Sequence, residues 1–272
     1  MGKKLLDKLP TKEFDLQDAN SLEEAIQRIY IITKRLRKEC PWDREQTFDS
    51  IRHLTIEEVF ELSDAIINKD WESIKEELGD VLLHVMFYSV MGEEQEKFNI
   101  VEVINKLSNK LIERHPHVYG DLHVDNASQV KQNWEKIKNK NAKRKSVLDG
   151  VPDSMPSLIK AYRLQEKASQ YGFDWDSPDS VKNKVLEELE ELEKTNSKAD
   201  REKEFGDLLF ALINYARHLG INPDTALELA NKKFKQRFQK IEEEARKRNV
   251  PLEQMTLKEM DQIWNKAKES EN

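Results

Sequence analysis

Residues 54–62 read LTIEEVFEL, and this stretch determines how the rest of the chain is interpreted. It places three carboxylates, Glu57, Glu58 and Glu61, inside an apolar pattern with helical spacing. The apolar arc expected on a helical wheel consists of Leu54, Val59, Leu62, Ala65 and Ile66. Glu58 falls inside that arc, where a carboxylate is costly unless it is paired, protonated or bound to a metal.

A second acidic pair follows, because Glu77 and Asp80 begin sixteen residues past Glu61. The pattern predicts helices over residues 48–68 and 71–91, the second of them largely buried from Leu78 onward. The short turn at residues 68–70 makes the two helices antiparallel neighbours. We therefore expect their carboxylate edges to face each other.

The second half of the chain repeats the first. Its acidic set is Glu187, Glu188, Glu191, Glu204 and Asp207. Further matches pair Trp42-Asp43 with Trp175-Asp176, Lys110 with Lys233, Arg114 with Arg237, Trp134 with Trp264 and Lys138 with Lys268. A duplication explains these matches better than chance. The predicted fold is all-α, with tandem duplicated helical bundles completed by dimerisation. The expected segments are a lead-in at 1–20, a first repeat at 21–138, a linker at 139–156 and a second repeat at 157–272.

The composition is that of a soluble helical protein. The chain has 272 residues, of which 36% are charged and 38% hydrophobic, with only 8 Gly and 8 Pro. The net charge of −7 does not favour stable nucleic-acid binding. A single cysteine, Cys40, excludes an internal disulfide and fits a reducing compartment. The N-terminal segment has no apolar core of signal-peptide length, and the longest apolar run, residues 81–91, is too short to span a bilayer, so we expect a cytoplasmic protein.

The two acidic sets predict magnesium sites for a phosphate-bearing substrate. Carboxylates gathered without cations would repel one another, and a hard divalent cation removes that repulsion. Oxygen ligands favour Mg²⁺ over Zn²⁺, and bound Mg²⁺ usually shares its coordination with substrate phosphates. A solvated helix face is the simpler interpretation of one EExxE run, but the recurrence of the whole pattern argues against it. A di-iron site would need a Glu-x-x-His motif on two helices, which neither repeat contains.

Cations and tryptophans form a second group of candidates. Four-residue spacings predict that basic residues hold the diphosphate leaving group, namely Lys110, Arg114, Lys138, Lys233, Arg237 and Lys268. Trp134, Trp175 and Trp264 stack on a base or belong to the core, and the sequence leaves both interpretations open. Asp176 caps a helix or accepts a hydrogen bond from a base or sugar. His84 has no counterpart in the second repeat, where Ala211 aligns with it, and is interpreted as structural.

These motifs together resemble a known family. The EExxE and ExxD motifs, with CPWDREQT at residues 40–47 and ERHPHVY at 113–119, resemble the two-repeat MazG nucleoside triphosphate pyrophosphohydrolases. The resemblance spans residues 21–268. It implies an all-α fold, homodimers, and Mg²⁺-dependent cleavage of NTPs and dNTPs between the α- and β-phosphates, which limits noncanonical or excess nucleotides. CPWD is altered in the second repeat and RHPH is missing there, so the two sites should differ.

The resulting prediction is a nucleoside triphosphate pyrophosphohydrolase. Its metal ligands are predicted to be Glu58, Glu61, Glu77, Asp80, Glu188, Glu191, Glu204 and Asp207. Glu57 and Glu187 are assigned to orienting water, and Lys233 and Arg237 to stabilising the departing pyrophosphate. Two alternatives remain, a nucleotide-binding regulator without turnover and a helical interaction module with surface acids.

Overall fold

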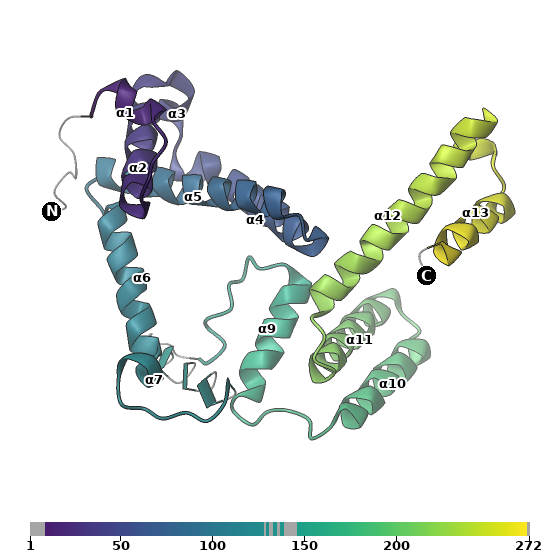
Figure 1. Cartoon of the computed structure of the whole chain (residues 1–272). Coiled ribbons are helices and arrows are strands. Elements are labelled where there is room, and N and C mark those ends of the chain that lie inside the picture. The colour runs from purple at the N-terminus through teal and green to yellow at the C-terminus, as the bar shows by residue number, and fades with distance from the viewer. Residues whose placement is uncertain (1–8, 128, 131–132, 135–136, 139–145, 271–272) are drawn as a thin grey trace. The chain divides into compact units, whose positions relative to one another are not determined.

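A computed structural model describes residues 9–127, 129–130, 133–134, 137–138 and 146–270. The described residues contain helices and no strand, which confirms the all-α prediction (Figure 1). The chain divides into two compact units, Met1–Lys138 and Asn139–Asn272. No helix among the described residues is both long and apolar enough to cross a bilayer.

The first unit is organised around a hairpin of two long helices. Its helices are α1 (Lys12–Leu16), α2 (Leu22–Glu39), α3 (Pro41–Glu45), α4 (Phe48–Asn68), α5 (Trp71–Glu94), α6 (Ile100–Arg114) and α7 (Pro116–Tyr119). A capping box begins α4, in which Thr47 and Ser50 exchange side-chain and backbone hydrogen bonds. Lys69 ends α4 in the left-handed conformation with φ of 57°, and the Asp70 carboxylate caps α5. The hairpin therefore turns within two residues.

The core of the first unit lies along the C-terminal half of α5. Tyr30 of α2 packs with Met86, Val90 and Ile100 in one buried cluster. On another side of α5, the buried cluster consists of Ile51, Phe87 and Met91, with Phe48, Leu54, Leu83 and Tyr88 packed around it. Gly92 permits the turn into α6, because a Cβ there would lie 2.7 Å from the Phe98 ring.

Two expectations about this hairpin hold only in part. From Leu78 onward, α5 is buried or half-buried at most positions, but Leu78 is 53% exposed and Leu82 and Val85 are each 38% exposed. On α4, Ala65 of the expected arc is buried, but Val59 and Ile66 of that arc are exposed, and Ile51, which lies outside it, is buried. Both errors have the same cause, because the apolar pattern marks every surface that avoids water and does not separate the chain's own core from a surface left uncovered.

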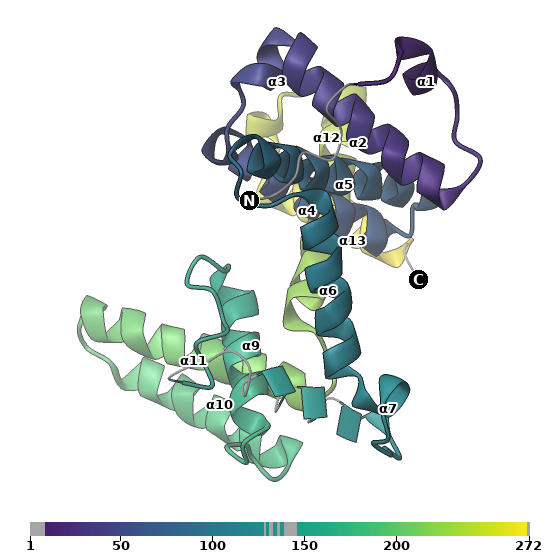
Figure 2. The same cartoon turned by 90° about the vertical axis from the view of Figure 1, so that its left-hand side faces the viewer.

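The second unit repeats the hairpin. Its helices are α9 (Ser157–Ser169), α10 (Pro178–Lys194), α11 (Lys198–His218), α12 (Pro223–Arg248) and α13 (Leu257–Glu269), with a short 3₁₀ helix, η1 (Leu252–Gln254). Figure 2 shows α10 and α11 side by side, and the serines Ser177 and Ser197 cap their N-termini. A separate hairpin joins α12 to α13 around Ile241, Ala245 and Met255.

The structure adds detail to several other expectations. The lead-in contains the short helix α1, whose Asp15 pairs with Arg35 of α2. The segment PWDRE, part of the CPWDREQT motif, forms the short helix α3. Positions 135–136, between the candidate residues Trp134 and Lys138, lie outside the described residues. Positions 139–145 of the expected linker also lie outside them.

Candidate functional site

The α4–α5 hairpin gathers three of the predicted metal ligands. Glu58 of α4 and Glu77 and Asp80 of α5 each place one carboxylate oxygen within 4.8 Å of the others. Glu77 and Asp80 are one helical turn apart, and the tight turn sets the register that brings Glu58 opposite them. All three side chains are half-buried. We refer to Glu58, Glu77 and Asp80 as the first carboxylate site.

Charge repulsion is visible at this site. Burial raises the pKa of Glu58 above its ordinary value, and the nearby charges of Asp80, Glu61 and Glu77 raise it further. Burial also raises the pKa of Glu77, with the charge of Glu61 as the next cause and a hydrogen bond with Glu61 adding to the rise. Glu61 and Glu57 are themselves exposed. The site holds negative charge that a bound cation would stabilise.

A buried histidine lies beside Glu58. The Nε2 atom of His84 is 3.9 Å from a Glu58 oxygen. Its Nδ1 atom is 2.9 Å from the Thr55 hydroxyl, which is also 2.7 Å from the Tyr88 hydroxyl. Burial lowers the pKa of His84, although the charge of Asp80 acts in the opposite direction. The sequence interpretation treated His84 as structural and did not single out Thr55, although Asp80 and His84 are four residues apart on one helix face.

The α10–α11 hairpin forms a second carboxylate site, made by Glu188, Glu191 and Glu204. One oxygen from each lies within 4.8 Å of the others. Glu188 is buried and Glu191 is exposed. Asp207, the remaining predicted ligand in this repeat, is exposed and outside the group of three. The two hairpins therefore bring together different subsets of their matching acids.

Two lysines also distinguish the second site. Lys184 lies 2.8 Å from a carboxylate oxygen of Glu187 and 2.8 Å from one of Glu188. These hydrogen bonds raise the pKa of Lys184. Lys203 lies 3.4 Å from Glu204, whose charge raises the pKa of Lys203. Extending the match of the repeats places Leu54 and Glu76 at the corresponding positions of the first repeat. The second site is thus partly neutralised by its own chain, which the sequence interpretation did not predict.

The predicted cations and tryptophans form one matching pair in each unit. The Arg114 guanidinium lies 5.4 Å from the centre of the Trp134 ring, and Arg237 lies 5.4 Å from that of Trp264. These pairs involve α6 and α12, whereas the carboxylates lie on the α4–α5 and α10–α11 hairpins. The flanking lysines are exposed at Lys110, Lys233 and Lys268 and half-buried at Lys138. Cation–π contact fixes the orientation of each arginine.

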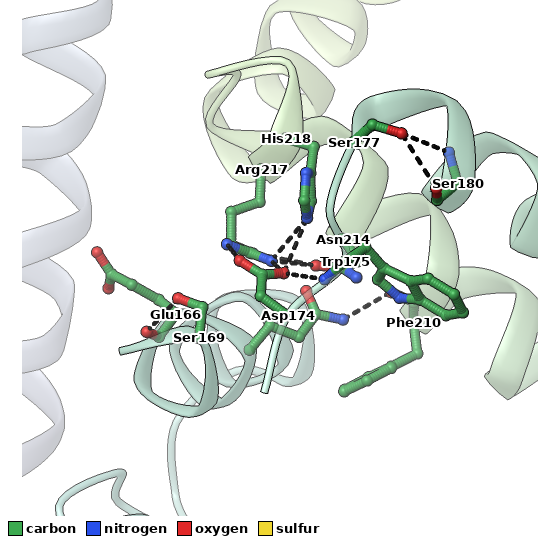
Figure 3. A network of polar contacts seen from close by, with 11 residues as sticks. Glu166, Ser169, Asp174, Trp175, Ser177, Ser180, Phe210, Asn214, Arg217 and His218 are labelled. Carbon is green, nitrogen blue, oxygen red and sulfur yellow. Dashed lines mark hydrogen bonds and ion pairs between the residues drawn. The ribbon is translucent and has the colours of Figure 1, made fainter. Parts of the chain in front are cut away.

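A polar network anchors the loop that contains Trp175 and Asp176 (Figure 3). Asp174 accepts hydrogen bonds from both terminal nitrogens of Arg217 and lies 2.9 Å from His218 Nε2. Burial alone would raise the pKa of Asp174, but the hydrogen bonds from Arg217 and His218 outweigh it and lower the pKa. Trp175 and Asp176 are both exposed on this anchored loop. The sequence interpretation did not identify Asp174 or its partners.

The fold and these sites define an all-α protein with two acidic helix hairpins. The MazG nucleotide pyrophosphohydrolase domain family matches residues 46–119, which contain the whole first carboxylate site. The nucleoside triphosphate pyrophosphohydrolase of Escherichia coli K12 is 39% identical over 257 residues, covering 90% of this chain and 98% of that protein. The nucleoside triphosphate pyrophosphohydrolase/pyrophosphatase MazG of Thermotoga maritima is 44% identical over 231 residues, covering 84% of this chain and 89% of that protein. The chain belongs to the MazG nucleoside triphosphate pyrophosphohydrolase family, and it is a hydrolase.

Proposed function

We propose that the protein hydrolyses NTPs and dNTPs to the nucleoside monophosphate and pyrophosphate in a Mg²⁺-dependent reaction. The observation that carries this proposal is the convergence of three carboxylates at the first site, with oxygens within 4.8 Å of one another. The names of the two similar proteins, nucleoside triphosphate pyrophosphohydrolases, support the substrate class.

The residues present fit a hard divalent cation. The converging groups at both sites are carboxylates, and carboxylate oxygens are the protein ligands that Mg²⁺ prefers. Glu58, Glu77 and Asp80 would hold the ion at the first site, with Glu61 next to them. Glu188, Glu191 and Glu204 would hold it at the second, with Asp207 nearby. When bound, Mg²⁺ neutralises phosphate charge and activates the attacking water.

The remaining predicted residues act on water and on the leaving group. Glu57 is exposed next to Glu58, where its carboxylate can accept a proton from an attacking water. Glu187 has the same place in the second repeat and is held by Lys184. Lys233 and Arg237 would stabilise the negative charge that develops on the departing pyrophosphate. Lys110 and Arg114 have the same role in the first repeat.

The remaining substrate contacts are assigned to aromatic and polar side chains. A ring face on Trp134, Trp175 or Trp264 offers a stacking surface to a base. Lys138 and Lys268 add positive charge for the phosphates, and Asp176 offers an acceptor to the base or sugar. Orientation of the arginines by Trp134 and Trp264 supports this assignment.

A homodimer is part of the proposal. Apolar side chains of both hairpins are exposed within a single chain, among them Val59, Phe60, Leu78, Phe205 and Phe210. The second unit also has an apolar groove of about 520 Å³, lined by residues of α9 and α11 with Pro223. Exposed apolar surface on this scale is typical of a protein–protein interface. A second copy of the chain would cover these faces, which sedimentation equilibrium of the full chain tests.

The reaction is tested with the double substitution Glu58→Gln plus Glu188→Gln. We expect it to abolish Mg²⁺-dependent pyrophosphate release while the helical circular dichroism is retained. The matched control is Glu72→Gln plus Glu190→Gln, which removes one exposed acid from each hairpin, on α5 and α10, where these acids pair with Lys75 and Lys194. Normal turnover in the first double variant would refute the proposed mechanism.

Two further measurements separate the alternatives. Calorimetric titration with Mg²⁺ and a nonhydrolysable NTP distinguishes an enzyme, which binds and turns over, from a regulator, which only binds. A helical interaction module would do neither. A panel of NTPs, dNTPs and damaged nucleotides tests the proposed role in sanitising the nucleotide pool, which we place in the cytoplasm.

A further inference from the structure

His84 is the one feature of the first carboxylate site that the proposed reaction does not use. Its side chain lies on α5 next to Glu58 and is 8% exposed as a residue. Among the described residues, Nε2 has no hydrogen-bond partner, and its nearest charged atom is the Glu58 oxygen at 3.9 Å. That distance is too long for a hydrogen bond. It lies within the span of two ligands that share one ion, because each ligand bond is about 2.0–2.2 Å long.

The hydrogen bonds of Thr55 assign the proton of the imidazole. A threonine hydroxyl has one hydrogen to donate and two lone pairs to accept with. Thr55 donates its hydrogen to the Ile51 carbonyl at 3.2 Å. When that bond is made, Thr55 accepts from both the Tyr88 hydroxyl at 2.7 Å and His84 Nδ1 at 2.9 Å. In this arrangement Nδ1 carries the proton, and Nε2 presents a lone pair toward Glu58.

A lone pair directed at a carboxylate is repulsive unless a cation lies between them. The same arrangement, in which Nδ1–H is held by an oxygen acceptor and Nε2 is free to ligate, orients histidine ligands in metal sites. We propose that the first carboxylate site is a mixed carboxylate–imidazole site that takes a divalent first-row transition metal ion through Glu58, Asp80, Glu77 and His84. The inference deepens the proposed function, because it rests on the same carboxylates and adds a nitrogen ligand that Mg²⁺ does not favour.

The second carboxylate site offers a contrast within the same chain. Ala211 is aligned with His84 and has no donor atom, and it is buried in α11. Val185 takes the place of Thr55 by the same match of the repeats, so the group that orients the imidazole is also missing. Lys184 adds a positive charge against Glu188 there. The two sites of one chain are therefore expected to differ in ion preference, because only the first gains affinity for transition metal ions from a nitrogen ligand.

Mn²⁺ is the probe for the test, because its electron spin reports directly on ligand nitrogen. The full chain is used with Glu188→Gln and Glu191→Gln, which silence the second site. Pulsed electron paramagnetic resonance of the Mn²⁺-loaded protein should show ¹⁴N coupling from one imidazole. His84→Gln should abolish that coupling, and the matched control His53→Gln, at an exposed position of α4, should retain it.

Affinity gives a second readout. His84→Gln should weaken Mn²⁺ binding by about tenfold or more, whereas Mg²⁺ binding should change by no more than about threefold, since Mg²⁺ gains little from imidazole. Thr55→Val removes the acceptor that fixes the tautomer and should weaken Mn²⁺ binding by a smaller factor. Retained circular dichroism and thermal unfolding show that the variants fold.

Two results would overturn the inference. One is a Mn²⁺-loaded protein without ¹⁴N coupling, or with coupling that persists in His84→Gln. The other is an equal loss of Mn²⁺ and Mg²⁺ affinity in His84→Gln. Failure of the proposed hydrolysis can be told apart from failure of this inference. A chain that binds Mn²⁺ through a nitrogen ligand but releases no pyrophosphate refutes the proposed reaction and leaves the inference about the metal site standing.

Discussion

Substitution of Glu58 by Gln should stabilise the metal-free protein. Glu58 has an oxygen within 4.8 Å of one from Glu77 and one from Asp80, and burial and these neighbours raise its pKa. The neutral amide has nearly the same size and removes two repulsive pairs. Most core-facing substitutions lower stability, so a gain is a specific expectation.

Coulomb's law gives the size of the effect. Two unit charges 4.8 Å apart repel by about 0.9 kcal/mol in water and about 3.5 kcal/mol at an effective dielectric constant of 20. The Glu58 side chain is 21% exposed, so solvent screens the repulsion and the lower value applies more closely. Two pairs then give a gain of about 2 kcal/mol, which corresponds to an increase in Tm of about 4–8 °C.

Differential scanning calorimetry at pH 8 in the presence of EDTA measures this increase. In excess Mg²⁺ the order should reverse, because ion binding at 100 times Kd stabilises the native chain by about 2.7 kcal/mol and Glu58→Gln binds the ion weakly. Glu188→Gln is the matched control. In the native chain, the contact of Glu188 with Lys184 at 2.8 Å is attractive and offsets the repulsion of Glu188 by Glu191 and Glu204. The Tm of the Glu188→Gln protein should therefore change little or fall.

Two outcomes would refute the reasoning. A metal-free Glu58→Gln protein with unchanged or lower Tm would show that the carboxylates do not repel one another in the folded chain. Equal gains for Glu58→Gln and Glu188→Gln would show that Lys184 does not neutralise the second site.

Three further predictions concern pH and the anchoring contacts. Because the pKa of Glu58 is raised, the repulsion between Glu58 and its acidic neighbours appears only as pH rises through that pKa. The difference in the free energy of unfolding between the native chain and Glu58→Gln should therefore vanish below about pH 4 and grow above it. Urea unfolding in EDTA measures this difference. The lowered pKa of Asp174 has the opposite sign. Asp174→Asn should cost about 1–3 kcal/mol at neutral pH through its lost bonds with Arg217. This cost should shrink as pH falls below the ordinary carboxyl pKa and disappear as pH falls through the lowered pKa of Asp174. Trp264→Ala should release Arg237 and raise the KM for NTPs several-fold. It should also lower thermal stability, because Trp264 packs against the cluster of α12 and α13. An unchanged KM would contradict a substrate role for the pair.

Much of the fold followed from the sequence, because helix signals are local. The predicted helix over residues 48–68 matches α4, and the helix predicted over 71–91 extends to Glu94 as α5. The turn predicted at residues 68–70 depends on neighbouring residues, as do the caps that Ser21 and Thr47 form in the structure, because each cap bonds to backbone groups a few residues away. The buried side of each helix depends on distant partners, which explains why Val59 was wrongly expected to face the core.

The acids themselves were also predictable, but their partners were not. Spacing of three on each helix placed Glu58 and Asp80 on facing edges. It did not reveal that Lys184 lies in the second site, because a lysine three or four residues before an acid is also typical of any solvated helix. The proposed ligand role of His84 was not predicted for a related reason, because it depends on the hydroxyl of Thr55, 29 residues away in sequence.

The length of the turn between α4 and α5 determines which side chains of the two helices meet at the first carboxylate site. Only Lys69 and Asp70 separate the helices, and each added residue within α5 would rotate its following side chains by about 100°. Surface loops normally tolerate changes in length. Here an insertion after Asp70 that extends α5 would keep every apolar residue and every acid of the chain, yet turn Glu77 and Asp80 away from Glu58. The number of residues in this connection is therefore as much a part of the site as the carboxylates are.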